Sequence, residues 1–167
     1  MTDAFAAAAG QGHAWIAARI PHAGSMCLLA GVVQATPQAI TCTADSHRAP
    51  DHPLRQDGRL GAACGVEYAA QAMALHGTLR AAQQQAAPAR IGLLVNLREL
   101  RLHTPRLDGI AAPLTIHAEC ETESGNLCIY RFHLHADGRA LVEGRLTVIL
   151  GVTSTAITRN DAVAKNN

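Results

Sequence analysis

One carboxylate of this chain, Glu67, stands where a side chain can carry out proton transfer. It falls in the first turn of a predicted helix that Gly65 opens and that Gly77 is expected to end. The positive end of the helix dipole favours a negative charge there, and free backbone N–H groups can bind a ligand oxygen. A glutamate in a first turn often does no more than satisfy the dipole. The helix is predicted from apolar residues at i, i+3 and i+4 spacing: Val66, Ala69, Ala70, Met73 and Ala74.

Three histidines are candidates for a base that would act with Glu67. His47 and His52 lie in a polar loop, residues 46–59, that leads into the helix, and His22 follows Pro21 near the start of the chain. Imidazole changes charge near neutral pH, which makes histidine the usual general base. A histidine in a loop is more often simply solvated. Cys64, just before the helix, is a candidate nucleophile, although a small buried thiol is the more common role.

The elements that would position these residues are a hairpin, one helix and a strand meander. Residues 30–35 and 39–44 flank a Thr-Pro-Gln turn and predict the hairpin. After the helix, residues 83–88 predict an exposed linker. Alternating apolar residues then predict four strands, around residues 91–102, 114–120, 128–134 and 142–148, with a bulge or bend near Arg98 where the apolar parity changes.

The apolar faces of the meander meet only if paired residue numbers have an even sum, for example 118 with 132 and 120 with 130. This register requires odd-length turns at residues 124–126 and 137–139. It places Arg131 opposite both Glu119 and Arg145 on neighbouring strands, one favourable and one unfavourable pair.

The same register puts His117 opposite His133 and brings His135 onto the same polar sheet face. Three imidazoles on one face could bind zinc or nickel. An exposed face or an oligomer contact explains such a group more simply, so we expect no metal site and no cofactor.

Composition indicates one domain over residues 1–167, with a core of about 14–150 and frayed termini that include residues 158–167. Hydrophobic residues make up 49% of the chain but aromatic residues only 3%, so Ala, Leu and Val must fill the interior. The net charge of +1 gives no electrostatic reason to bind nucleic acid or an anionic membrane. We find no signal peptide and no run of eighteen apolar residues that would span a membrane.

The five cysteines argue for a reducing compartment, and we expect the protein to be cytoplasmic. Their number is odd and none forms a Cys-x-x-Cys pair, which argues against a disulfide framework and against a structural zinc site.

The amino-acid sequence of the predicted helix resembles that of a known family. Gly65-Val66-Glu67 followed by Gln71-Ala72-Met73-Ala74 resembles the central helix of the hotdog-fold 3-hydroxyacyl-[acyl-carrier-protein] dehydratases. In that family a glycine-opened helix carries the catalytic carboxylate and a glutamine follows four residues later. Residues 19–33 resemble its opening segment, in which His22 matches a non-catalytic Pro-His position. The resemblance covers about residues 14–150 and is closest to the aryl-polyene-type dehydratase-like branch, through Ser46-His47-Arg48, Pro53-Leu54-Arg55 and Gly65-Val66-Glu67-Tyr68.

The resemblance implies an α+β hotdog fold, in which a curved antiparallel sheet wraps around one long central helix. It implies elimination of water from 3-hydroxyacyl thioesters of acyl carrier protein or CoA, in a homodimer or a heterodimer with a paralogous dehydratase. Glu67 would be the acid if burial favours its neutral form. The N–H groups of Gly65 or Val66 would hold the thioester oxygen, and Gln71 and His22 would help to bind substrate.

The sequence departs from the family at the base. The Gly-His-Phe-Pro motif that carries the catalytic histidine is absent, and Pro53 stands at the corresponding position. Either His47 or His52 replaces that histidine, or the chain is a non-catalytic partner subunit whose paralogue supplies it. A third alternative is a hotdog acyl thioesterase in which Glu67 activates water.

Overall fold

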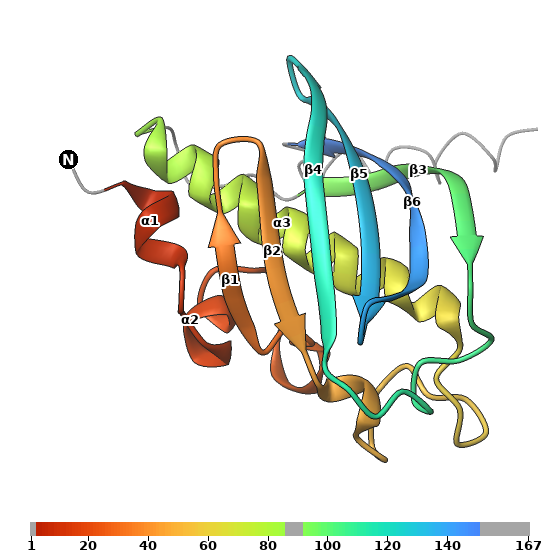
Figure 1. Ribbon diagram of the computed structural model, residues 1–167. Coiled ribbons are helices and arrows are strands. Elements are labelled where there is room, and N and C mark those ends of the chain that lie inside the picture. The colour runs from red at the N-terminus through yellow and green to blue at the C-terminus, as the bar shows by residue number, and fades with distance from the viewer. Residues whose placement is uncertain (1–2, 86–91, 151–167) are drawn as a thin grey trace, which may run out of the picture.

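A six-stranded antiparallel sheet curves around one long helix in the computed structural model, which describes residues 3–85 and 92–150 (Figure 1). The strand order is β1-β2-β4-β5-β6-β3, so β1 and β3 are the edges. This arrangement confirms the predicted α+β class. The helices are α1 (Ala4–Ala8), α2 (His13–Ala17) and α3 (Gly65–Gln83), and the strands are β1 (Gly31–Ala35), β2 (Ala39–Ala44), β3 (Gly92–Leu102), β4 (Leu114–Ser124), β5 (Leu127–Ala136) and β6 (Arg139–Leu150).

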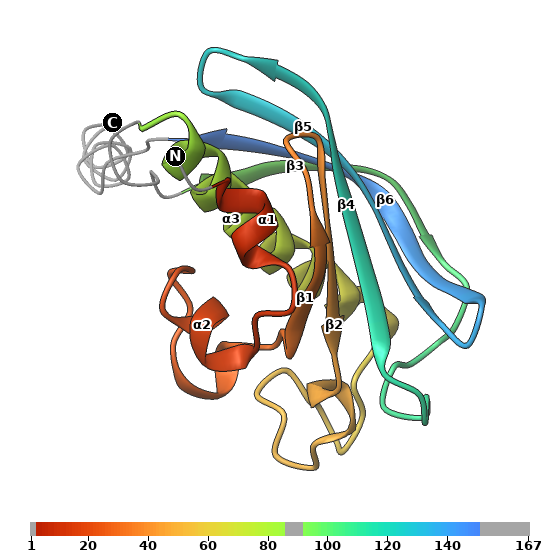
Figure 2. The same ribbon diagram turned by 60° about the vertical axis from the view of Figure 1, so that its left-hand side comes forward.

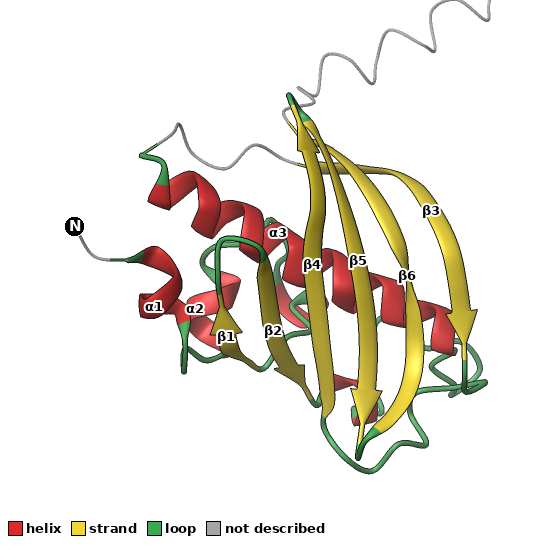
Figure 3. Cartoon of the chain, turned by 45° about the horizontal axis from the view of Figure 1, so that its top comes forward, coloured by secondary structure: helices red, strands yellow, loops and turns green. Residues whose placement is uncertain are grey.

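The sheet and the short N-terminal helices lie on different sides of α3 (Figures 2 and 3). The last turn of α3 is tied to α1, because the Ala4 N–H donates to Gln83 Oε1 at 2.8 Å. Within the described residues, no helix is long and apolar enough to cross a bilayer. The predicted frayed tail, residues 158–167, and part of the predicted linker lie outside the described residues.

The predicted helix is present, but it does not end at Gly77. Leu75 and Leu79 are buried on either side of this glycine, and burying them outweighs the roughly 1 kcal/mol that a glycine costs inside a helix. The face packed on the core also differs from the predicted stripe, since Ala70 and Ala74 are only partly buried. The buried helix residues are Gly65, Tyr68, Ala69, Gln71, Ala72, Met73, Leu75, His76 and Leu79.

The start of α3 presses against the sheet at Gly65. A Cβ atom on this residue would lie 2.9 Å from Val142 Cγ2 and 3.1 Å from Leu134 Cδ2. Only a glycine therefore allows this approach of the first helical turn to β5 and β6.

The predicted even-sum register is confirmed, with Ala118 opposite Phe132 and Cys120 opposite Tyr130. The expected odd-length turns are wrong. Both turns have two residues, and one-residue bulges at Glu121 and Leu141 restore the even register further along the strands. Asp137 and Gly138 both have positive φ, of 48° and 71°, the conformation of a tight two-residue hairpin turn.

The Glu121 bulge also resolves the unfavourable pairing of two arginines. Arg131 does stand opposite Arg145. Glu121 lies between them, and its Oε1 accepts from Arg131 Nε at 2.7 Å while its Oε2 accepts from Arg145 Nε at 2.8 Å. A second predicted irregularity, near Arg98, is confirmed as a register shift in which Glu99 has a φ of 55°.

Candidate active site

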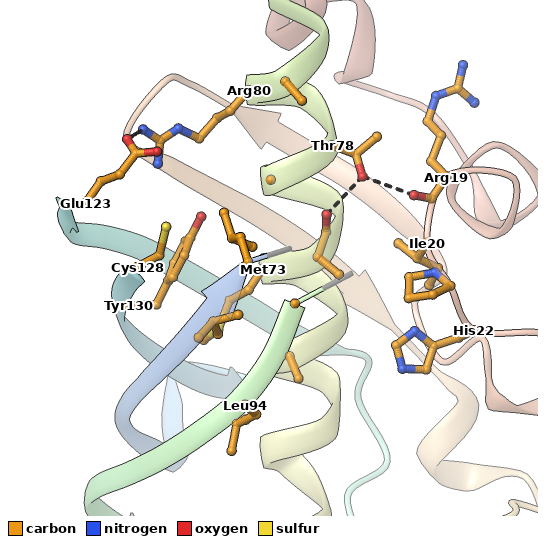
Figure 4. Close-up of a pocket in the computed structure, with 18 of the residues that line it drawn as sticks. Arg19, Ile20, His22, Met73, Thr78, Arg80, Leu94, Glu123, Cys128 and Tyr130 are labelled. Atoms are coloured by element: carbon orange, nitrogen blue, oxygen red, sulfur yellow. Dashed lines mark hydrogen bonds and ion pairs between the residues drawn. The ribbon is translucent and has the colours of Figure 1, made fainter. Parts of the chain in front are cut away.

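A pocket of about 680 Å³ runs along the side of α3 that is not buried in the core (Figure 4). Residues 18–22 form one wall, and strands β3, β4, β5 and β6 contribute the other. The helix supplies a floor of mostly small side chains. Its contributions are Glu67, Ala70, Met73, Ala74, Gly77, Thr78, Arg80 and Ala81, and Gln84 lines the pocket directly after the helix.

Glu67 and His22 meet at this pocket. His22 Nε2 lies 2.9 Å from Glu67 Oε1, and both side chains line the cavity. They are 25% and 29% exposed respectively, so a ligand in the pocket can reach them. The structure therefore brings the predicted carboxylate together with the histidine that the family resemblance marked as non-catalytic.

The buried side chain of Gln71 donates a hydrogen bond to the carboxylate of Glu67. It is fully buried, and its Oε1 accepts from the Leu28 N–H at 2.9 Å. Its Nε2 donates to the Met26 carbonyl at 2.7 Å and to Glu67 Oε1 at 3.0 Å. Gln71 is not among the residues that line the pocket, and its contact with the site is the bond to the carboxylate; its role in binding substrate stays a prediction. Both His22 and Gln71 contact Oε1, while Oε2 has no hydrogen bond to any described residue.

His47 does not reach the pocket. Its side chain is fully buried, and Nε2 lies 3.0 Å from the Ile110 carbonyl, to which it must donate because a carbonyl only accepts. Burial is the main cause that lowers the pKa of this histidine. It fixes the loop before α3 to the segment before β4.

His52 is also buried away from the pocket, and burial lowers its pKa as well. Its Nδ1 accepts from the Leu54 N–H at 3.1 Å, so in the neutral ring Nε2 carries the hydrogen and donates to the Tyr68 hydroxyl at 3.0 Å. Tyr68 bonds Ser46 at 2.8 Å, and the Ser46 hydroxyl donates to the Leu28 carbonyl at 2.9 Å. Both nitrogens of His52 are thus committed to a structural network.

The start of α3 has fewer free backbone N–H groups than expected. A short 3₁₀ turn, Ala62–Cys64, precedes α3, and the Gly65 N–H donates to the carbonyls of Ala62 and Ala63. Neither Gly65 nor Val66 lines the pocket. Burial raises the pKa of the Cys64 thiol, which argues against a role as nucleophile.

The histidines of the outer sheet face have the predicted register. His117 and His133 have ring centroids 4.9 Å apart, and those of His133 and His135 lie 6.0 Å apart. His117 Nδ1 is hydrogen-bonded to Thr41 Oγ1 at 2.9 Å. Among residues 3–85 and 92–150, no three His, Cys, Asp or Glu side chains are arranged to hold a metal ion.

Sequence reasoning missed the other end of the pocket, where Arg80, Glu123 and Tyr130 gather with buried His76 behind them. Arg80 forms an ion pair with Glu123, and His76 Nδ1 lies 2.9 Å from the Tyr130 hydroxyl. These residues come from α3, β4 and β5. One feature of the sequence could have pointed to them: Arg80 follows Gly77 and Thr78 on the side of the helix that lines the pocket.

Comparison with solved structures shows the hotdog fold. One chain of the dehydratase heterocomplex ApeI:P from Xenorhabdus doucetiae matches with a TM-score of 0.74 and 22% identity, over 86% of this chain and 95% of that chain. Zebra fish thioesterase superfamily member 2 matches with a TM-score of 0.58 and 17% identity, over 83% and 95%. A Haemophilus influenzae thioesterase matches with a TM-score of 0.52 and 16% identity, over 71% and 76%.

No curated protein matches the sequence at a significant level. The model of the ApeP-like family, described as ApeP dehydratase, matches residues 14–158. That range includes the whole pocket with Glu67, His22 and Gln71. The chain therefore belongs to the ApeP-like dehydratase family.

Proposed function

We propose that this chain acts in the dehydration of 3-hydroxyacyl thioesters, with Glu67 as the group that exchanges protons with the substrate and His22 as its partner. The observation that carries the proposal is the 2.9 Å contact between His22 Nε2 and Glu67 Oε1 at the wall of an elongated pocket. His22 replaces His47 and His52 in this role, because only His22 lies at the pocket beside the carboxylate.

The chemistry needs two proton transfers. The thioester carbonyl acidifies the C2–H bond, and a base removes this proton as the C2–C3 double bond forms. The C3–O bond breaks, and the leaving hydroxyl takes up a proton to depart as water. Glu67 Oε2 would take the C2 proton, and the Glu67–His22 pair would return one proton to the hydroxyl. The enzyme then ends in the state in which it began.

The pocket suits an acyl chain. Ala70, Met73 and Ala74 form an apolar floor, and Leu94 and Val148 face it from the sheet. The substrate would be delivered as a thioester of acyl carrier protein or CoA. Membership of the ApeP-like family, together with the fold match to ApeI:P, favours polyene-type chains and aryl polyene biosynthesis.

We further propose that a second hotdog chain, a paralogous dehydratase, docks on the free edge of β3. Five of the large exposed hydrophobic side chains lie on this strand, and Gly92 and Leu94 of the same strand also line the pocket. A partner on this edge would pair with unused backbone groups and cover apolar surface beside the site. The match to one chain of a heterocomplex supports this arrangement. The five are Leu93, Leu94, Val95, Leu100 and Leu102.

The test is hydration of a crotonyl thioester, measured as loss of enoyl absorbance. It is run with the purified chain alone and with the chain mixed with a paralogous dehydratase that carries the Gly-His-Phe-Pro motif. We expect Glu67→Gln to lower the rate at least a hundredfold while the circular dichroism spectrum is unchanged. Activity only in the mixture would assign the chain as one half of a heteromeric enzyme. Full activity of the Glu67→Gln variant would refute the proposal, and release of free thiol without any change in enoyl absorbance would identify a thioesterase.

A further inference from the structure

The pocket has a polar end that the proposed dehydration does not use. Figure 4 shows Arg80, Glu123 and Tyr130 together at one end of the cavity and His22 at the other. Arg80 lies thirteen positions after Glu67 on α3, a rise of about 20 Å along the helix axis. A chain whose thioester lies at Glu67 would therefore reach this cluster only with its far end.

The cluster carries no net charge. The Arg80 guanidinium pairs with the Glu123 carboxylate, and its other terminal nitrogen donates to Cys120 Sγ at 3.2 Å. The Arg80 side chain is only 19% exposed and that of Glu123 is 43% exposed, so the ion pair is shielded from water mainly on the arginine side. Because Glu123 already neutralises Arg80, the site suits a neutral polar group better than a phosphate or a carboxylate.

His76 fixes the direction in which Tyr130 donates. His76 Nε2 lies 2.8 Å from the Thr36 carbonyl, so this nitrogen carries the hydrogen. Burial lowers the pKa of His76 to about 4, and the ring is therefore neutral at pH 7. Its Nδ1 must then accept the hydrogen of the Tyr130 hydroxyl, at 2.9 Å. The Tyr130 oxygen is left as an acceptor, and Arg80 lines the same end of the pocket.

We propose that Tyr130 and Arg80 form a binding subsite for a hydroxyl group at the far end of the acyl chain. The hydroxyl would donate to the Tyr130 oxygen and accept from the Arg80 guanidinium, while His76 acts as a positioning residue for Tyr130. A methyl end in the same place would remove water from the ion pair and offer no hydrogen bond in return. The orientation of the chain rests on the proposed function at Glu67.

Equilibrium binding tests the subsite independently of catalysis. The probes are N-acyl pantetheine amides, which cannot undergo elimination or hydrolysis at the amide, made in a series of chain lengths with a methyl or a hydroxyl end. Isothermal titration calorimetry would compare the affinities of the methyl-ended and hydroxyl-ended probes at each chain length. The protein would be used in the oligomeric state in which it purifies. We expect the hydroxyl end to bind about three- to tenfold more tightly at the length that spans the pocket, and no such preference for shorter chains.

Variants of Tyr130 and Glu123 identify the residues, with Tyr68→Phe as the control. Tyr130→Phe should abolish the preference, whereas Tyr68→Phe should retain it, because the hydroxyl of the other tyrosine is bonded to His52 and Ser46 away from the pocket. Glu123→Gln, at a residue whose side chain is 43% exposed, should raise the affinity for a carboxylate end by freeing the charge of Arg80. Equal binding of both ends at every length, binding of neither, or an unchanged preference in Tyr130→Phe would overturn the proposal. The same titrations with Glu67→Gln should give the same preference, so failure of the dehydration chemistry would leave this result intact.

Discussion

Gln71 and Glu67 lie one helical turn apart on α3, and the amide of Gln71 donates to the carboxylate at 3.0 Å. The same amide accepts from Leu28 and donates to Met26. One buried side chain thus couples the orientation of the carboxylate to the fold of the segment that follows His22.

Replacing Gln71 by methionine should therefore impair both stability and activity. The Leu28 N–H and the Met26 carbonyl would lose their buried partner, at a cost of about 1–3 kcal/mol each. Glu67 would also lose its hydrogen bond from Gln71 and keep only the contact with His22. Urea denaturation and the enoyl hydration rate would measure the two effects.

His22→Ala should separate those two effects. The His22 side chain is partly exposed and has Glu67 as its one polar partner among the described residues, so we expect the free energy of unfolding to fall by less than about 1 kcal/mol. The hydration rate should fall about a hundredfold or more, because proton transfer loses its partner. An undiminished rate in this variant, with Glu67→Gln inactive, would leave Glu67 as the sole proton-transfer group.

Gly65→Ala should destabilise the protein by about 1–3 kcal/mol, since the added Cβ would clash with Val142 Cγ2. Gly77→Ala is the matched control in the same helix. A Cβ at Gly77 meets no atom within 4 Å, so this change should stabilise the helix by up to about 1 kcal/mol. Thermal denaturation of the two variants should give shifts of opposite sign.

Stability should fall as the pH drops from 6.5 to about 4. His76 has a folded-state pKa near 4, below the ordinary value of 6.5, so in this range the unfolded chain binds a proton that the folded chain does not. Its contribution is fully present above pH 6.5 and is lost as the pH falls, by about 3 kcal/mol at pH 4. His47 and His52, whose pKa values burial also lowers, act in the same direction.

The fluorescence of Trp15, the single tryptophan, would follow urea unfolding at pH 7 and pH 4.5. His76→Gln should be less stable than the parent protein at pH 7, and the gap should narrow at pH 4.5. A gap that is constant with pH would contradict the assignment.

Val95→Arg should weaken assembly through β3. Val95 is 45% exposed on this edge strand, and a charge there would be buried without a partner. We expect at least a tenfold rise in the dissociation constant by light scattering or analytical centrifugation. Val33→Arg is the control, because Val33 is 56% exposed on the opposite edge strand, β1, and should leave assembly unchanged.

Much of the fold could be predicted from the sequence because periodicity reports burial directly. The alternation in residues 114–134 predicts the strand register, and the i, i+3, i+4 spacing around Glu67 predicts the helix, although not the face that it buries. The two-residue turns were missed although Asp137-Gly138 is a typical signal for one, because the bulge at Leu141 conceals the change of parity.

The partner of Glu67 could not be predicted from spacing. Proximity in sequence favoured His47 and His52, but the loop that carries them is drawn into the core by hydrogen bonds to Ile110 and Tyr68. His22 reaches Glu67 from a distant part of the chain, through the segment that Gln71 anchors at Met26 and Leu28. Contacts of this kind arise from tertiary packing and leave no local pattern.

The hydrogen bonds from His52 to Tyr68, Ser46 and Leu28 all point the same way, because the first nitrogen and the last carbonyl each have one possible role. A row of donors that all point one way can pass one proton along its length, and every hydroxyl in it must then rotate before a second proton can follow. Because His52 and Tyr68 are buried, the protons of this row should exchange with deuterium only when the loop detaches from α3. Native-state hydrogen exchange at the Leu54 amide, the donor at the head of this row, would report that opening as a local event, distinct from unfolding of the sheet.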